Sequence, residues 1–211
     1  MSICYKYAPD GTKIVVLSYV YDCIYWYTSE TLGKWFVDAL GKRFHVNLLV
    51  YAHWFMSIRI YQMKDHYISV DQARYDTSVV AKYLDTATVK TSTYSYKTTL
   101  PYDIIFAKSY AYTSDDQVDN LTREFVIHYR ACIVSFIYLL STRVDLILAV
   151  HKLEKFSSNP GKVHFEGLVH LLRYIRDNKN LVLNYYADMK YAPLSDQLIL
   201  SLNARLSQQV R

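Results

Sequence analysis

The apolar residues near the start of the chain follow first the period of strands and then that of a helix. Two runs rich in β-branched and aromatic residues, Lys13–Leu17 and Cys23–Trp26, are joined by Ser18–Asp22, and this pattern predicts a β-hairpin. After Ser29, apolar residues recur at helical spacing over 32–40. This spacing predicts a helix with Ser29 as its N-terminal cap.

Strand alternation returns in the next segment and is followed by a second helical pattern. Apolar side chains alternate with others over 54–61, which predicts one strand, and Tyr67–Val70 is predicted to pair with it. Asp71 is predicted to cap a helix that runs to about Leu84.

From about Leu121 the pattern is wholly helical. The spacing predicts three helices, over 125–140, 142–156 and 165–175, and Thr142 is the predicted cap of the second. Asn159-Pro160-Gly161 separates the last two, because proline and glycine both interrupt helices. Leu181–Tyr186 is predicted to be a strand.

These elements predict an α+β fold in two parts. Residues 1–85 contain the hairpin, the other strands and two helices, and residues 121–186 contain a helical bundle. Residues 86–120 are predicted to be a linker, because eight of the fourteen residues from Thr86 to Thr99 are Ser or Thr. Residues 187–211 form a tail.

The composition is that of a globular protein. Of 211 residues, 52% are hydrophobic and 20% charged, and the net charge of +5 permits contact with nucleic acid without demanding it. Cys4, Cys23 and Cys132 lack the spacing of metal ligands and are expected to be buried or reduced thiols. No secretory signal is found, and the most apolar stretch, 131–140, is about half the ~20 residues of a membrane span. We therefore expect an intracellular protein of the cytoplasm or nucleus.

The tip of the predicted hairpin gives the first indication of a function. Its sequence, Tyr19-Val20-Tyr21-Asp22, resembles the polymerase hairpin of reverse transcriptases. That family has Tyr-X-Asp-Asp at this turn, usually with Val at the second position in copia-type elements. In the family, the adjacent carboxylates help to hold two Mg²⁺ ions roughly 3.5–4 Å apart for nucleotidyl transfer.

Further stretches, in the right order and at the right spacing, resemble motifs of copia-type retrotransposon reverse transcriptases. WFMSIRI at 54–60 resembles Tyr-Phe-Leu-Gly-Ile-Glu-Ile. YRACIVSFIYL at 129–139 and STRVDL at 141–146 resemble Tyr-Arg-x-x-x-Gly-Ser-Leu-x-Tyr-Leu and Thr-Arg-Pro-Asp-Ile. FSSNP at 156–160, His164 and LLRYIR at 171–176 resemble Phe-x-x-x-Pro, His-Trp and Leu-Arg-Tyr-Leu-Lys. The resemblance covers about residues 13–186.

The resemblance implies the later part of a polymerase palm over 1–85, then the thumb or connection over 121–186, and a tail that leads towards an RNase H domain. It implies an ancestral RNA-directed DNA polymerase that used Mg²⁺ and gripped an RNA or DNA template–primer duplex. On that basis, five basic residues of the helical part are candidates for phosphate contact: Lys152, Lys155, Lys162, Arg173 and Arg176. The alternative for them is a solvated helix surface.

The hairpin departs from the family pattern in its carboxylates. Tyr21 stands where the family has its first hairpin aspartate, and a neutral phenol does not replace a hard anionic ligand of Mg²⁺. Asp22 remains as the catalytic and metal-ligand candidate, and the alternative is an ordinary turn aspartate. Val50, Val134 and Val182 stand where the family favours glycine, and they would be strained if those positions needed a positive φ.

The remaining polar and aromatic candidates have structural roles as their first interpretation. Arg143 and Asp145 are expected to form a local ion pair rather than to contact a substrate. Three tyrosines are expected to pack in the core rather than to stack on bases: Tyr129, Tyr138 and Tyr174. Three histidines are expected to be packing or surface residues rather than zinc ligands: His151, His164 and His170.

The sequence therefore predicts a catalytically inactive fragment of a copia-type reverse transcriptase, in which Mg²⁺ is not bound productively. A non-enzymatic nucleic-acid-binding module is the alternative, and a fragment that complements a fuller polymerase chain is a third possibility. Salt-dependent binding of a duplex would favour the second, and co-purification with a polymerase chain would favour the third. An incomplete palm would leave strand edges unpaired, which predicts poor solubility or oligomers.

Overall fold

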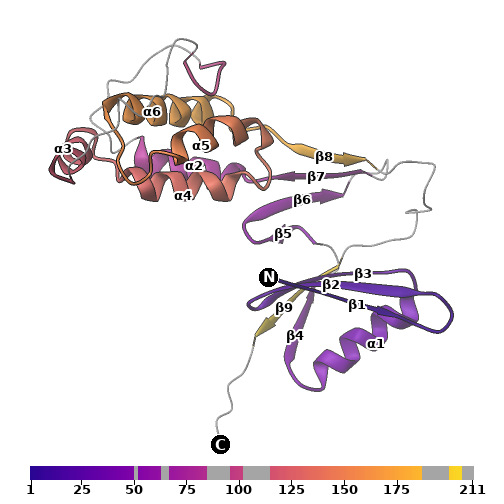
Figure 1. Ribbon diagram of the computed structural model, residues 1–211. Coiled ribbons are helices and arrows are strands. Elements are labelled where there is room, and N and C mark those ends of the chain that lie inside the picture. The colour runs from indigo at the N-terminus through magenta and orange to yellow at the C-terminus, as the bar shows by residue number, and fades with distance from the viewer. Residues whose placement is uncertain (50–51, 63–66, 85–95, 102–114, 187–199, 206–211) are drawn as a thin grey trace, which may run out of the picture. The chain divides into compact units, whose positions relative to one another are not determined.

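The computed structural model describes residues 1–49, 52–62, 67–84, 96–101, 115–186 and 200–205 (Figure 1). They form two compact units. One comprises Met1–Val70 and Asn184–Arg211, and the other comprises Asp71–Leu183. The first is built mainly from two sheets and the second from helices, so the predicted α+β class is confirmed.

The predicted hairpin lies within a five-stranded sheet of the first unit. Its two strands, β2 (Lys13–Tyr19) and β3 (Asp22–Tyr27), pair antiparallel. β1 (Ser2–Tyr7) pairs with the other edge of β2. β9 (Leu200–Arg205) lies between β3 and β4 (His45–Leu49), which gives the order β1-β2-β3-β9-β4 (Figure 1).

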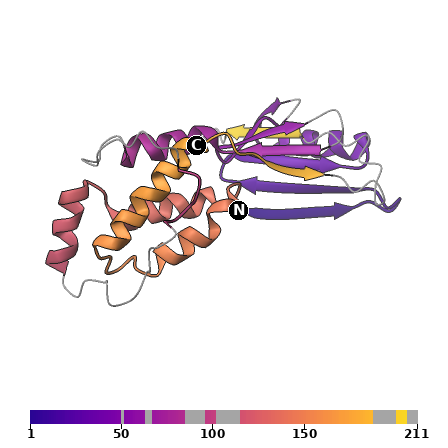
Figure 2. The ribbon, with the colours of Figure 1, turned by 90° about the horizontal axis from the view of Figure 1, so that it is seen from above.

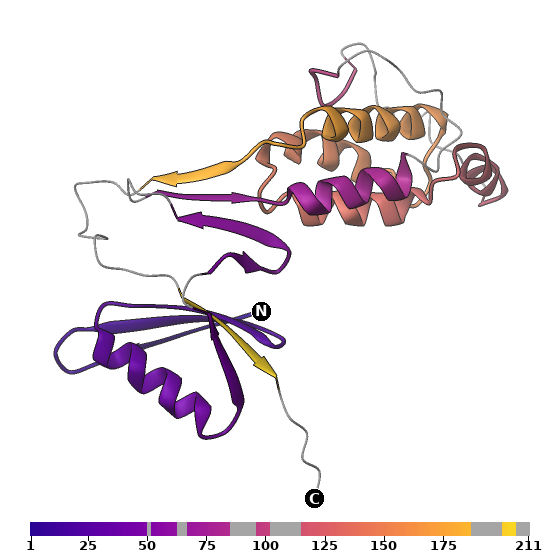
Figure 3. The same cartoon turned by 180° about the vertical axis from the view of Figure 1, so that it is seen from behind.

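One helix, α1 (Glu30–Gly41), covers one face of this sheet (Figure 3). The core between the sheet and the helix contains the buried side chains of Ile14, Tyr25 and Leu32. Alternate strand positions, Val16, Cys23 and Tyr27, pack against them. The helix approaches the sheet closely at Gly33, because a Cβ there would lie 2.7 Å from Cε1 of Tyr27. A larger residue at Gly33 would therefore force Tyr27 to move.

The second sheet of this unit corrects the single strand predicted over 54–61. β5 (Trp54–Phe55) and β6 (Ile58–Gln62) form an antiparallel hairpin instead. The chain reverses at Met56 and Ser57, whose φ angles are 51° and 60°. Two successive positive φ angles are the signature of a type I′ hairpin turn, which usually carries Asn-Gly and which the alternating pattern conceals here.

Two more strands complete this second sheet. β7 (Tyr67–Asp71) and β8 (Leu183–Tyr186) follow β6 in the order β5-β6-β7-β8, so the strands predicted at 67–70 and 181–186 are confirmed. Ser69 donates a hydrogen bond to Oδ1 of Asn184 at 2.5 Å and joins β7 to β8.

The second unit is a bundle of helices around one core, seen from above in Figure 2. The helices are α2 (Ala73–Tyr83), α3 (Asp115–Phe125), α4 (Tyr129–Leu139), a 3₁₀ turn (Val144–Leu146), α5 (Ile147–Glu154) and α6 (Lys162–Asp177). Val79, Val80 and Tyr83 bring α2 into this core, although the sequence placed that helix with residues 1–85. α3 begins inside the stretch predicted as a linker. No helix in the described part of the chain is long and apolar enough to cross a bilayer.

None of the three predicted helix caps makes a capping hydrogen bond from the N-cap position. The N-cap of α2 is Gln72, one residue after the predicted Asp71, whose carboxylate nevertheless accepts a hydrogen bond from the Ala73 backbone N–H at 3.0 Å. Ser29 stands at the N-cap of α1, but its side chain makes no capping bond. Thr142 caps no helix, and its hydroxyl donates instead to Oε1 of Gln72 at 2.8 Å, so that prediction is wrong.

The helix predicted over 125–140 is broken at Val126, where φ is 56°. Val126 follows the last residue of α3, at a position where helices commonly end on a left-handed glycine. The condition under which Val134 and Val182 would be strained is not met, because neither has a positive φ, and Val134 lies within α4. Val50 lies outside the described residues.

Val126→Gly is expected to stabilise the helical unit. A β-branched residue in the left-handed region is disfavoured by about 1–2 kcal/mol, and glycine removes that penalty. The Val126 side chain is 48% exposed, so little packing is lost. We expect the free energy of unfolding, measured by urea denaturation, to rise by about 1 kcal/mol. Val134→Gly, at a helical and more exposed position, is the control and should lower it by about 0.5–1 kcal/mol.

Candidate functional site

The hairpin tip has the tight turn that its sequence predicts. Tyr19 and Asp22 pair across β2 and β3, and only Val20 and Tyr21 lie between them. Val20 has φ 52°, and the Val20 and Tyr21 side chains are exposed, whereas Asp22 is partly buried at the start of β3. The turn therefore places one carboxylate at this end of the sheet.

Among the described residues, the strand register places no second carboxylate beside Asp22. Its partner on β2 is Tyr19, its partner on β9 is Asn203, and Asn203 is paired in turn with Asn47 of β4. All three are neutral residues. A pair of Mg²⁺ ions needs several hard anionic oxygens, so the residues at this end of the sheet do not fit the metal pair that the resemblance implies.

The five basic candidates divide into paired and unpaired side chains. Lys162 lies 3.5 Å from a carboxylate oxygen of Glu124. Arg173 and Arg176 both make hydrogen bonds within the helical unit. Lys152 and Lys155, at the end of α5, are exposed and make no ion pair with any residue that the structure describes. These two lysines remain open to solvent phosphate or to a polyanion.

A buried ionic cluster lies at the centre of the helical unit. Arg143 is 1% exposed and is held by two carboxylates. Its Nε and Nη2 donate to Oδ1 and Oδ2 of Asp145 at 3.0 and 2.9 Å, and Nη1 donates to Oδ2 of Asp76 at 2.8 Å. The Arg143–Asp145 ion pair predicted from the sequence is therefore confirmed. The guanidinium is too deeply buried to contact a substrate.

The sequence analysis missed Asp76, although the pattern contains a signal for it. Asp76 lies on the same stripe of α2 as Val79, Val80 and Tyr83, and all four are buried. A carboxylate in an apolar helical stripe needs a cationic partner, because an unpaired buried charge is strongly unfavourable. That partner is Arg143, sixty-seven residues further along the chain.

Burial raises the pKa of Asp76 to about 6, although the Arg143 guanidinium acts in the opposite direction. Oδ1 of Asp76 is buried without a hydrogen-bond partner among the described residues, and this favours the protonated carboxyl. Burial also acts to raise the pKa of Asp145, but the hydrogen bonds and the charge of Arg143 outweigh it and lower that pKa.

Asp76 should make the stability of the helical unit depend on pH. A carboxyl whose pKa is higher in the folded state than in the unfolded state binds more protons when folded. Its contribution to stability therefore grows as the pH falls through about 6. Between about pH 7 and about pH 5, we expect the natural chain to gain about 1 kcal/mol in unfolding free energy relative to Asp76→Asn.

The comparison with Asp76→Asn removes the contribution of the histidines. Burial lowers the pKa of His164 and of His170, so these two residues destabilise the folded state as the pH falls, in both proteins alike. Urea denaturation at several pH values gives the difference. A difference that is constant with pH would show that Asp76 keeps an ordinary pKa.

The predicted packing roles of the tyrosines and histidines agree with the structure. Tyr129 and Tyr174 are buried, and Tyr138 packs edge-on against Tyr75 with ring centroids 4.9 Å apart. His151 lies 3.2 Å from Glu154 at the surface. His164 is buried and accepts a hydrogen bond from the Gly161 backbone N–H at 2.8 Å. Its ring stacks on Phe156 with centroids 3.9 Å apart.

The three thiols differ in their environments. Cys132 is buried, as expected, and burial raises its pKa well above the usual value. Cys23 is partly buried, and burial raises its pKa to about 11. Cys4 is exposed. All three are free thiols.

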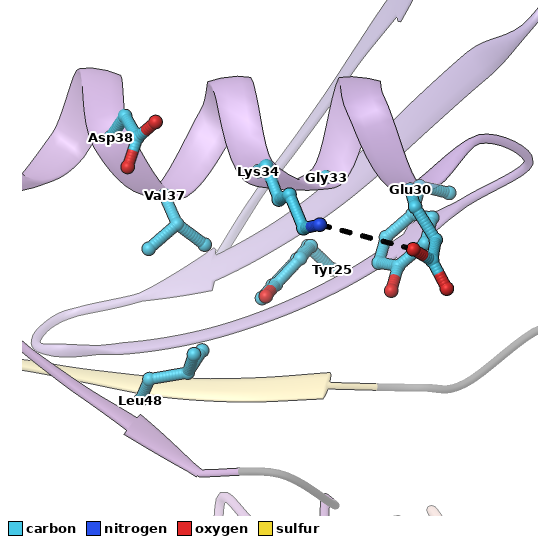
Figure 4. Close-up of a pocket in the computed structure, with 8 residues that line it drawn as sticks. Tyr25, Glu30, Gly33, Lys34, Val37, Asp38 and Leu48 are labelled. Carbon is cyan, nitrogen blue, oxygen red and sulfur yellow. Dashed lines mark ion pairs between the residues drawn. The ribbon is translucent and has the colours of Figure 1, made fainter.

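A pocket of about 310 Å³ lies between α1 and the five-stranded sheet (Figure 4). The rings of Tyr25 and Tyr27, with centroids 6.0 Å apart, line it together with Leu48. Glu30 and Lys34, 4.0 Å apart, lie on the α1 side and are largely exposed. The sequence analysis named none of these residues. The described lining supplies aromatic and apolar surface but no buried charge to orient a ligand.

The chain is similar to a retroelement polyprotein. Over an aligned length of 198 residues, which covers 88% of this chain, it is 26% identical to the retrovirus-related Pol polyprotein from transposon RE2 of Arabidopsis thaliana. The chain spans 12% of the length of that relative. No family model matches the chain, and no solved structure matches it. The similarity supports a fragment derived from a retrotransposon Pol polyprotein.

Proposed function

We propose that the chain is a fragment of a copia-type reverse transcriptase, with the later palm and the thumb or connection, and that it lacks polymerase activity. The hairpin tip carries the proposal. It has the tight turn that a polymerase hairpin needs, and it presents Asp22 with neutral residues at the paired positions. The similarity to a transposon Pol polyprotein and the ordered motifs over 54–176 support the origin.

The loss of activity follows from the ligands that remain. Two-metal nucleotidyl transfer requires carboxylates that hold both ions and neutralise the charge that develops on the phosphate. Asp22 supplies one carboxylate, and Tyr21 supplies an exposed neutral phenol beside it. Mg²⁺ is therefore not part of the proposed present function.

A template–primer duplex is the proposed ancestral partner. Lys152 and Lys155 are the exposed basic side chains that could still contact its phosphates. Each phosphate contact of this kind weakens as the salt concentration rises, because binding releases counterions. Two lysines alone predict weak binding without sequence preference.

Primer extension tests the proposal directly. The natural chain, Tyr21→Asp and Asp22→Asn are incubated with an oligo(dT) primer on a poly(A) template and with Mg²⁺ or Mn²⁺. Binding of the template–primer is recorded in the same reactions. We expect no extension by any of the three, because even Tyr21→Asp places only two adjacent carboxylates beside the neutral residues that the strand register pairs at this end of the sheet.

Each outcome has a distinct meaning. Extension by the natural chain that Asp22→Asn abolishes would overturn the proposal and show that other groups complete the metal site. Salt-sensitive binding of the template–primer without extension would identify a nucleic-acid-binding module whose helical unit still contacts the duplex. If the chain shows neither binding nor extension, it retains the fold but neither activity.

A further inference from the structure

Part of the Ser/Thr-rich stretch is bound to the last turns of α6 (Figure 1). The Tyr96 backbone N–H donates to Oδ2 of Asp177 at 2.8 Å, and Nδ2 of Asn178 donates to the Tyr96 carbonyl oxygen at 3.0 Å. Both polar backbone groups of one residue are thus bound by two side chains. Tyr96 therefore has both of its polar backbone groups satisfied without pairing to a strand.

The Tyr96 side chain is recognised over its whole length. Nη1 of Arg173 donates to the Tyr96 hydroxyl at 2.8 Å, and the guanidinium carbon lies 5.5 Å from the ring centroid. The His170 ring packs edge-on against the same ring, with centroids 4.6 Å apart. Phenylalanine could make the ring contacts but not the bond to Arg173, so the site distinguishes tyrosine from phenylalanine.

Two further contacts fix the direction of the segment. Nε2 of His170 lies 2.8 Å from the Thr98 carbonyl oxygen, so the ring nitrogen donates to it. Leu100 packs against the apolar core of the helical unit. The segment Tyr96–Pro101 therefore follows α6 back from its C-terminal end, bends at Thr98–Leu100, and is anchored at its first, third and fifth residues.

Two of the recognising side chains, Asp177 and Asn178, are also held by α6 itself. Nε of Arg176 donates to Oδ1 of Asp177 at 2.8 Å, which leaves Oδ2 for Tyr96. Nδ2 of Asn178 also donates to the Tyr174 carbonyl oxygen at 2.9 Å. Because α6 itself holds both side chains, the site should persist when the segment leaves.

We propose that the C-terminal part of α6 is a binding site for a peptide segment that begins with tyrosine, and that Tyr96–Pro101 fills it in cis. Asp177 and Asn178 bind the Tyr96 backbone, and Arg173 binds its hydroxyl. His170 packs against the Tyr96 ring and donates to the carbonyl oxygen of Thr98, the third residue of the segment. A tyrosine-led segment of the same chemistry, supplied in trans, occupies the site once Tyr96 is removed. The proposal does not depend on the polymerase origin of the chain.

The test supplies the segment in trans. A peptide with the sequence of residues 96–101, acetylated, amidated and fluorescently labelled at its C-terminus, is titrated with the natural chain and with Tyr96→Ala. We expect saturable binding to Tyr96→Ala and at least about tenfold weaker binding to the natural chain, whose own segment competes at an effective concentration on the order of millimolar. A peptide with Phe for Tyr should bind about tenfold more weakly, because it lacks the bond to Arg173.

Three results would overturn the proposal: no binding to Tyr96→Ala, equal binding to both chains, or equal binding of a peptide with Ala for Tyr. Circular dichroism establishes that Tyr96→Ala is folded. If it is not, hydrogen exchange on the natural chain and on Tyr96→Phe takes its place. The Tyr96 amide should be protected in the natural chain and exchange faster in Tyr96→Phe, and an unprotected amide in the natural chain would reject the site.

Discussion

Replacement of Arg143 by methionine is expected to lower the free energy of unfolding of the helical unit by about 3–5 kcal/mol. Methionine fills a similar volume, so the loss comes from the charge rather than from a cavity. Asp76 would remain 1% exposed with no cation beside it. A buried carboxylate without its partner must either stay charged at a high cost or take up a proton.

Urea denaturation followed by circular dichroism measures this effect. The matched control is Arg130→Met, which removes an exposed arginine from the first turn of α4 and should change the free energy by less than about 0.5 kcal/mol. A cost for Arg143→Met no larger than that of Arg130→Met would show that the cluster does not hold the unit together.

The double variant Asp76→Leu with Arg143→Met separates the energy of the ion pair from the energy of side-chain packing. Replacing both partners of a buried ion pair with apolar residues is often neutral, whereas removing one partner is not. We therefore expect the double variant to recover a large part of the stability that Arg143→Met loses. Strict additivity of the two single effects would indicate that Asp76 and Arg143 do not interact.

The elements that the sequence predicts correctly are those with a regular local pattern. The β2–β3 hairpin, the helix after Ser29 and the break before α6 each follow from side chains within a few residues of one another. The Arg143–Asp145 ion pair was accessible for the same reason, since the two residues are separated by one position.

The features that the sequence did not predict depend on backbone geometry or on distant partners. Met56 and Ser57 adopt positive φ angles in a turn, although neither residue type favours them. Val126 ends a helix at a position where glycine would be expected. The bond between Asp76 and Arg143 joins residues whose proximity depends on how α2 packs in the bundle. A single sequence shows that Asp76 needs a partner but not which residue is that partner.

Phe165→Ala is expected to cost about 3–5 kcal/mol, which rivals the effect of Arg143→Met. Phe165 is fully buried in α6, and its ring lies 5.2 Å from the Phe125 ring and 5.1 Å from the Tyr129 ring, between centroids. Truncation loses the transfer free energy of the ring, leaves a cavity and removes both aromatic contacts. The same urea experiment measures the loss.

Two comparison variants give this result its meaning. Phe165→Leu keeps most of the buried volume and should cost clearly less than Phe165→Ala, while Ile147→Ala, at a 41% exposed position of α5, should cost about 1 kcal/mol or less. Equal costs for all three would indicate a loosely packed helical unit without a fixed core. A steep dependence on the size of residue 165 would instead show that the helical unit has specific native packing. Failure to extend a primer would then be a consequence of the missing carboxylates rather than of a helical unit that does not fold.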